Sequence, residues 1–236
     1  ESAAIALRNQ IRRQELDETR DAIMLALAKL AEHRDPETGA HIERVQEYCR
    51  LLCETLATMP KYADVIDRAF IENIVRSSPL HDIGKVGVPD HILLKPGKLT
   101  HEEFEIMKQH VHIGSNTIKA LIQKGQSQAF LEMGMQIALS HHEKYNGQGY
   151  PYGLKGEEIP LPARIMAVAD VYDALTSERV YKTAMPHEQA TSIIIKEAGV
   201  HFDPDVVTAF RHRERQFRKL VIELANDSKG LETARA

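Results

Sequence analysis

Apolar residues recur at spacings of three and four along most of the chain, and the alternation typical of β-strands is scarce. This pattern predicts an all-α protein. Thr100 and Glu103 form a capping box at the start of one helix, and the Gly- and Pro-rich stretch before it is expected to be irregular. The last dozen residues are expected to be frayed. The predicted helices cover about residues 1–30, 36–56, 63–78, 101–112, 113–124, 128–143, 163–176, 187–198 and 204–224.

The first predicted helix changes character along its length. The stretch "RNQIRRQELDETRD" is polar on every side, and "AIMLALAKLAEH" after it is apolar. A polar helix that leads into an apolar one is typical of a connecting or self-pairing segment, so a homodimer through this helix is one expectation. The alternative is an exposed helix without a role. Because the chain starts at Glu1 and not at a methionine, we also hypothesise that it is the output module of a larger signalling protein.

Composition narrows the function. Hydrophobic residues make up 43% and charged residues 27% of the 236 residues, which is ordinary for a globular protein. A net charge of −4 gives no general reason to bind nucleic acid or anionic membranes, so a phosphate ligand would need a local cationic site. The sequence has neither an apolar run of about 18 residues nor a signal peptide, which predicts a cytoplasmic protein. Cys49 and Cys53 are expected to be small core residues, with a metal role as the alternative.

The twelve histidines are unusual, because several stand beside carboxylates. Each such pair is common on its own, as a surface pair or a satisfied structural group. Together they change the interpretation, since imidazoles and carboxylates suit iron, manganese or zinc. The candidates exceed the four to six ligands of one ion, which favours a multinuclear site if they converge. They are Glu37 with His41, His81 with Asp82 and Lys85, His110 or His112, His141 with His142, and Asp170 with Asp173.

The order of these blocks resembles the HD-GYP family. Glu-x3-His, HDIGK, His-x3-Gly, HHE, GxGYPxGLxGxxIPxxARI and VADxYDALTSxRxY follow one another in the chain. The resemblance covers about residues 22–220 and implies an all-α HD-domain helical bundle with a lip loop at the GYP motif. It implies residues 1–21 as a linker helix and 221–236 as a tail. The implied activity is metal-dependent hydrolysis of cyclic di-GMP to linear pGpG or GMP.

The resemblance also implies the metal ligands. The rule His-x3-Gly selects His110 over His112, and Asp82 would bridge two ions and act in catalysis. A glutamate at position 37 resembles the subgroup that holds three ions, of which iron is the expected metal and manganese the alternative. The implied ligand set is Glu37, His41, His81, Asp82, His110, His141, His142 and Asp170.

Substrate contacts follow in the same way. Two neighbouring ions can generate a hydroxide nucleophile and neutralise a phosphate, and Lys85 would contact the phosphate or the leaving group. Gly147 and Gly149 would let the lip loop approach a ligand closely. Tyr150 would stack on the nucleotide, with a plug against the core as its alternative. The implied substrate-binding residues are Lys85, Gly149, Tyr150, Asp173, Arg179 and Lys182.

Other functions stay open from the sequence. Relatives in the HD superfamily cleave nucleoside phosphates or ppGpp, and some HD-GYP members prefer cyclic GMP-AMP. A receptor that binds cyclic di-GMP without turnover is a second alternative, and a purely structural helical protein is a third, disfavoured because buried imidazoles and carboxylates would be costly without a metal. The lip loop of the family is also associated with diguanylate-cyclase domains, which are therefore candidate partners.

Overall fold

The computed structural model describes residues 2–32, 34, 40–123, 129–177 and 183–233. These residues form an all-α protein, as predicted, and β-type pairing among them is limited to two isolated bridges. Three 3-10 turns, η1 (Ser78–Leu80), η2 (Ile83–Gly87) and η4 (Gly156–Glu158), lie between the helices. The helices are α1 (Ser2–Glu32), α2 (His41–Leu56), α3 (Arg68–Ser77), α4 (Asp90–Leu93), α5 (His101–Met107), α6 (His110–Leu121), α7 (Ala129–Ser140), α8 (Leu161–Thr176), α9 (His187–Lys196) and α10 (Pro204–Thr233).

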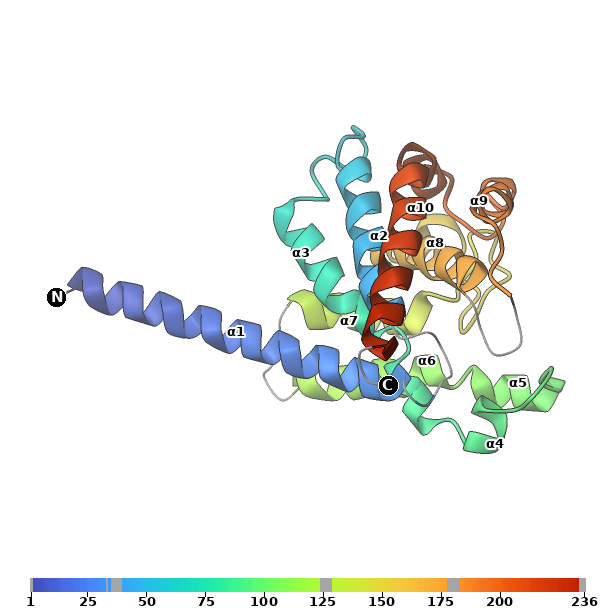
Figure 1. Ribbon diagram of the computed structural model, residues 1–236, viewed down its shortest axis with the longest axis horizontal. Helices are drawn as coiled ribbons and strands as arrows, with labels where there is room; N and C mark the ends of the chain where they lie inside the picture. Colours follow the sequence, from blue (N-terminus) through green and yellow to red (C-terminus); the bar gives the residue numbers. More distant parts are fainter. Residues whose placement is uncertain (1, 33, 35–39, 124–128, 178–182, 234–236) are drawn as a thin grey trace.

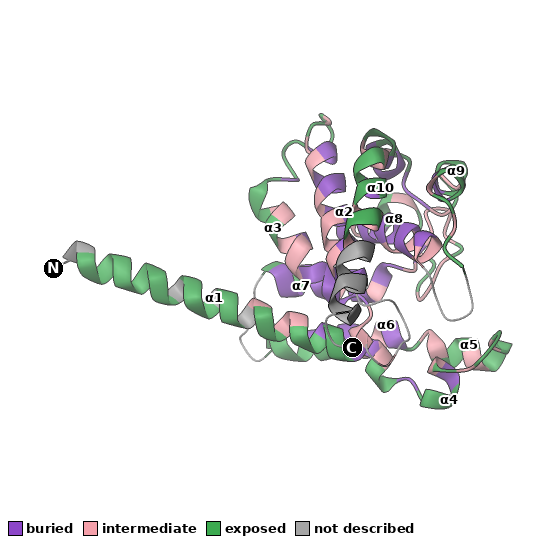
Figure 2. Cartoon of the chain, in the orientation of Figure 1, coloured by how far each residue is buried: buried purple, intermediate pink, exposed green. Residues whose placement is uncertain are grey.

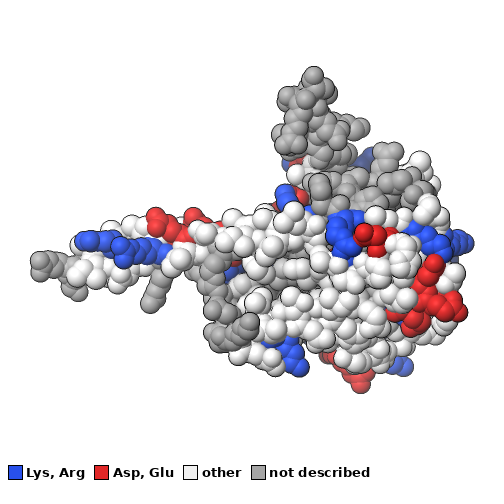
Figure 3. Space-filling model, turned by 90° about the horizontal axis from the view of Figure 1, so that it is seen from below, with Lys and Arg blue, Asp and Glu red and all other residues white. Residues whose placement is uncertain are grey.

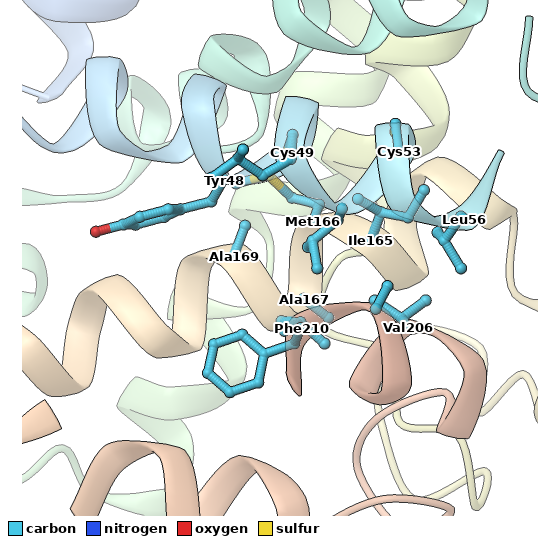
Figure 4. Close-up of a cluster of buried hydrophobic side chains, with 14 of the residues drawn as sticks. Tyr48, Cys49, Cys53, Leu56, Ile165, Met166, Ala167, Ala169, Val206 and Phe210 are labelled. Atoms are coloured by element: carbon cyan, nitrogen blue, oxygen red, sulfur yellow. The ribbon is translucent and has the colours of Figure 1, made fainter. Parts of the chain in front are cut away.

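The main core lies where α2, α8 and α10 pack together (Figure 4). The Tyr48 ring stacks on Phe217 with centroids 4.3 Å apart and meets Tyr172 edge-on. Cys49 and Cys53 are free thiols buried in this core, and the Cys49 sulfur lies 4.0 Å from that of Met166. The prediction that both cysteines are small core residues is confirmed.

A second, smaller core joins α6, α7 and η1. It consists of Leu80, Ile118, Phe130, Leu131 and Ala138, all buried. Leu80 is the last residue of η1, so its burial fixes the backbone just before His81. The main core thus packs α2 and α8, and the second core packs η1 and α6, while α7 contributes residues to both.

The N-terminal helix α1 leaves the body as a long stalk (Figure 1). Most of its described side chains are exposed (Figure 2), whereas Ala28 and Ala31 near its end are buried. Asp21 pairs with Arg76 of α3, with an Nη2–Oδ1 distance of 2.7 Å. In the view of Figure 3, side chains of both signs are scattered over the visible surface of the described residues. That face gives no sign of a broad basic surface.

Several boundaries differ from the prediction. α3 begins at Arg68, because the Asp67 side chain accepts a hydrogen bond from the Phe70 amide and caps the helix there. The break predicted after residue 112 lies instead between α5 and α6, at 108–109. The capping box at Thr100 and Glu103 is present as predicted. The tail is helical as far as Thr233, where fraying was predicted. No described helix meets the length and apolarity that a membrane crossing requires.

Candidate metal centre

The Asp82 carboxylate lies at the centre of the histidine-rich region. It is the residue that precedes η2, one position after the buried His81. Its Oδ2 lies 3.3 Å from His81 Nε2 and 2.7 Å from the Lys85 ammonium. Its Oδ1 lies 3.4 Å from His110 Nε2 and 3.7 Å from His141 Nε2. One short side chain thus faces imidazoles from three different parts of the chain.

Two groups of donors able to hold a metal ion form around it, with the donor atoms of each group within 4.8 Å of one another. The first group comes from η2, the start of α6 and the end of α7, and the second from α2, η1 and α8. His112 instead lies against the Tyr152 ring, 5.8 Å away between centroids. The groups are Asp82, His110, His141 and His142, and His41, His81 and Asp170.

Three of the imidazoles are oriented by their own helical turns. The Nδ1 atoms of His81, His110 and His141 lie 2.8–3.0 Å from the main-chain carbonyl oxygens of Ser78, Met107 and Ile137 respectively. Because a carbonyl can only accept, each Nδ1 must carry the proton. Nε2 then carries a lone pair that is directed toward Asp82, which is the arrangement in which a histidine ligates a metal.

Electrostatics favours ligand forms of these groups. Burial would raise the pKa of Asp82, but Lys85 and His81 outweigh it and hold that pKa well below its usual range. Burial lowers the pKa of His110 to about 4 and that of His142 well below its ordinary value. At neutral pH the site therefore combines the Asp82 carboxylate with uncharged His110 and His142, which is the state metal binding requires. Burial would lower the pKa of His81, but Asp82 outweighs it and raises that pKa.

Unused polar atoms test whether these residues fit a metal. Asp82 Oδ1 and the Nε2 atoms of His81, His110 and His141 are buried and make no hydrogen bond within the described residues. A buried polar atom without a partner costs about 1–3 kcal/mol, so four of them in one place need an explanation. Nitrogen and oxygen donors of this kind suit a first-row divalent ion. The residues fit a metal centre.

The loop after His142 folds back over it. Tyr150 stacks on the His142 ring, with centroids 4.8 Å apart and planes inclined by 26°. A Cβ added to Gly149 would lie 2.2 Å from the Lys144 amide nitrogen, so only glycine permits this close approach of the loop to its own start. Tyr150 is half-buried and contacts the site directly, which differs from the alternative of a plug against the core.

Glu143 is a residue of this loop to which the sequence analysis assigned no role. Its buried carboxylate accepts hydrogen bonds from the amides of Tyr152 (2.8 Å) and Leu154 (3.1 Å). It therefore fixes the far side of the loop to the end of α7. The motif "HHE" contained the residue, but only the tertiary structure shows which amides it binds.

The remaining predicted site residues fall into two classes. Glu37, Arg179 and Lys182 lie outside the residues that the structure describes. Asp173, predicted to bind substrate, is 1% exposed, and both its oxygens are engaged by Arg44 and His41. The prediction of a direct substrate contact for Asp173 is wrong, because no face of this carboxylate is open to a ligand.

Several known proteins have sequences similar to this chain. A model of the HD domain family matches residues 26–206. A probable cyclic di-GMP phosphodiesterase of Vibrio cholerae is 50% identical over 92% of this chain and 49% of its own length. A cyclic di-GMP phosphodiesterase of the same organism is 52% identical, over 86% and 41%. A 3'3'-cGAMP-specific phosphodiesterase from that organism is 40% identical, over 82% and 34%.

The chain thus spans about half or less of the length of these curated relatives. Among solved structures, a cyclic GMP-AMP specific phosphodiesterase of V. cholerae aligns with a TM-score of 0.58. The alignment covers 89% of this chain and 53% of that one at 18% identity. At this identity the likeness shows a common fold.

Proposed function

We propose, from the premise that this chain belongs to the HD domain family and within it to the HD-GYP group, that it is a metal-dependent phosphodiesterase of cyclic di-GMP. The observation that carries the proposal is the convergence of two groups of metal-binding donors, one of four that includes Asp82 and one of three beside it. Hydrolysis would open the cyclic dinucleotide to linear pGpG, and a second cut would give GMP.

Individual residues of the chain have separate roles in the proposed reaction. When bound, neighbouring divalent ions supply an activated water and neutralise charge on the phosphate. Asp82 presents one oxygen to each donor group and thereby fixes their separation. The Lys85 ammonium lies beside it, 14% exposed, where it can contact a phosphate oxygen. Arg179 and Lys182 are proposed to bind the phosphates, and Tyr150 to stack on a base.

The number and identity of the ions form the finer part of the proposal. The two donor groups support at least two ions, and Glu37 would add a ligand for a third. Iron is the expected metal and manganese the alternative, since imidazole and carboxylate donors suit both. Metal analysis of anaerobically purified protein distinguishes two from three ions and iron from manganese.

Product analysis tests the activity itself. The metal-loaded protein is incubated separately with cyclic di-GMP and with 3'3'-cGAMP, because relatives with either specificity exist. Release of pGpG or GMP supports the proposal. Preferential cleavage of 3'3'-cGAMP would shift the substrate to the mixed dinucleotide. Recovery of intact cyclic di-GMP from a tight complex would overturn it in favour of a receptor.

Replacing Lys85 with alanine should separate catalysis from metal binding. Lys85 contacts Asp82 through its ammonium and is no metal donor, so we expect turnover to fall about 100-fold with little loss of metal. Turnover and metal content are measured on the same sample. Lys61→Ala is the matched control, since Lys61 pairs with Asp205 and Glu157 outside the site. Unchanged turnover in Lys85→Ala would remove this lysine from the mechanism.

The stalk supports a homodimer. Leu16, Ile23 and Leu30 recur every seven residues on α1 and are 62%, 54% and 67% exposed, the spacing of a coiled-coil seam. Leu16→Glu with Ile23→Glu should convert a dimer to a monomer in sedimentation. Leu7→Glu is the control, because nine residues at about 100° each place Leu7 on the opposite side. A wild-type chain that is monomeric at all concentrations contradicts this part.

Three further points complete the proposal. The greater length of the relatives supports a role as the output module of a signalling protein. A cytoplasmic location follows from its substrate, a bacterial second messenger. The lip loop presents Tyr152, 62% exposed, which supports it as a docking site for a diguanylate-cyclase domain.

A further inference from the structure

Asp173 does not face a ligand, so its role must lie in the residues that it contacts. Its carboxylate is buried between α2 and α8, with Oδ2 2.8 Å from His41 Nδ1 and Oδ1 2.6 Å from Arg44 Nε. Arg44 Nη2 also donates to Oδ2 at 2.8 Å, so the guanidinium engages both oxygens. The bidentate geometry fixes the plane of the carboxylate.

His41 differs from three other imidazoles of the site in the origin of its hydrogen-bond acceptor. His81, His110 and His141 are oriented by carbonyls three or four residues earlier in their own turns. His41 is the first residue of α2. Its orienting acceptor comes instead from α8, 132 residues later in the chain.

Arg44 completes the arrangement from the same side of α2. It lies three residues after His41, so both side chains project from one face of the helix. Its Nη2 also donates to the Ser177 hydroxyl at 2.8 Å, at the end of α8. Ser177 is two residues before Arg179, one of the two proposed phosphate ligands. The Asp173–Arg44 pair thus also fixes the end of α8, two residues before Arg179 in the sequence.

We infer that Asp173, held by Arg44, is a positioning residue that fixes the proton of His41 on Nδ1 and directs Nε2 into the donor group with His81 and Asp170. The inference rests on the proposed metal-dependent function. A carboxylate behind a metal-binding imidazole raises its basicity, and its loss typically costs 10–100-fold in metal affinity. The effect should fall on one donor group, because Asp173 does not contact the group around His110.

Asp173→Asn is the test, measured by Mn²⁺ titration of the metal-stripped chain. An amide can donate to His41 Nδ1 and reverse the imidazole tautomer, so we expect the Mn²⁺ affinity of one class of sites to fall by 10–100-fold. The affinity of the other class should be unchanged. Asp203→Asn is the matched control. Asp203 is about as buried as Asp173 and also pairs with an arginine, Arg164, but its other oxygen accepts from the Asp205 amide and not from a histidine of a donor group. Its metal sites should be unaffected even where its melting temperature falls.

Several results would overturn the inference or the proposed function on which it rests. Unchanged Mn²⁺ sites with weaker cyclic di-GMP binding would make Asp173 a substrate ligand after all. Equal weakening of both site classes, with the thermal shift of Asp203→Asn, would make it a purely structural residue. A wild-type chain that binds no Mn²⁺ and no Fe²⁺ would overturn the proposed function itself. If the wild-type chain binds Mn²⁺ and Asp173→Asn binds it equally well, this inference alone is overturned.

Discussion

Asp82→Asn should lower cyclic di-GMP hydrolysis by at least about a thousand-fold, because several kcal/mol of charge stabilisation depend on this carboxylate. Its two oxygens face separate donor groups, and its charge pairs with Lys85 at 2.7 Å. An amide offers one oxygen and no charge, so both groups lose a donor or its orientation. Product formation and metal content are measured together, and we expect both to fall.

The control for this substitution is Asp64→Asn. Asp64 is an exposed aspartate in the turn between α2 and α3, outside both donor groups. It should retain full activity and metal content. Full metal content combined with full activity in Asp82→Asn would exclude a bridging role for this carboxylate.

Gly84→Ala should be the most damaging substitution at a residue that touches neither metal nor substrate. A Cβ at this position would lie 1.9 Å from the His110 carbonyl oxygen and 2.5 Å from the Gly114 amide nitrogen. Both are backbone atoms, so η2 must move away from α6 and carry Asp82 and Lys85 with it. We expect about 1–3 kcal/mol of destabilisation or more and a loss of roughly 100-fold in turnover from the misplaced groups.

Thermal melting and turnover together check this expectation, with Gly156→Ala as the control. No atom lies within 4 Å of a Cβ at Gly156, and its φ of +60° makes an alanine cost about 1–2 kcal/mol in the backbone alone. The control should therefore lose stability but keep its turnover. If Gly84→Ala is as active as Gly156→Ala, the contact of η2 with α6 does not position the site.

The sequence allowed the residues of the candidate site to be predicted, but less of how they are arranged in space. The helical class followed from apolar spacing, and the start of α5 from Thr100 and Glu103, because both signals act within one or two turns. The choice of His110 over His112 came from the resemblance to a family, whose motif carries the spacing to Gly114. A Cβ added to Gly114 would lie 3.2 Å from the Gly84 amide nitrogen, which gives a physical reason for a small residue there.

Other features depended on contacts that no local pattern contains. Glu143 was part of a quoted motif, yet the amides it binds lie nine and eleven residues away in an irregular loop. Asp173 was assigned to the substrate on its motif, whereas the folded chain turns it inward to Arg44 and His41. The last dozen residues were expected to be frayed, as chain ends often are, although α10 continues to Thr233.

Sequence alone determined the residue types suited to metal binding, the helical class and the order of the motifs, because these depend on chemistry and short-range periodicity. Tertiary structure alone decided that Asp82 faces two donor groups and that His41 is oriented from α8. Those facts are set by how α2, α8 and η2 pack around two cores, and packing joins residues whose separation in the chain bears no relation to their distance in space.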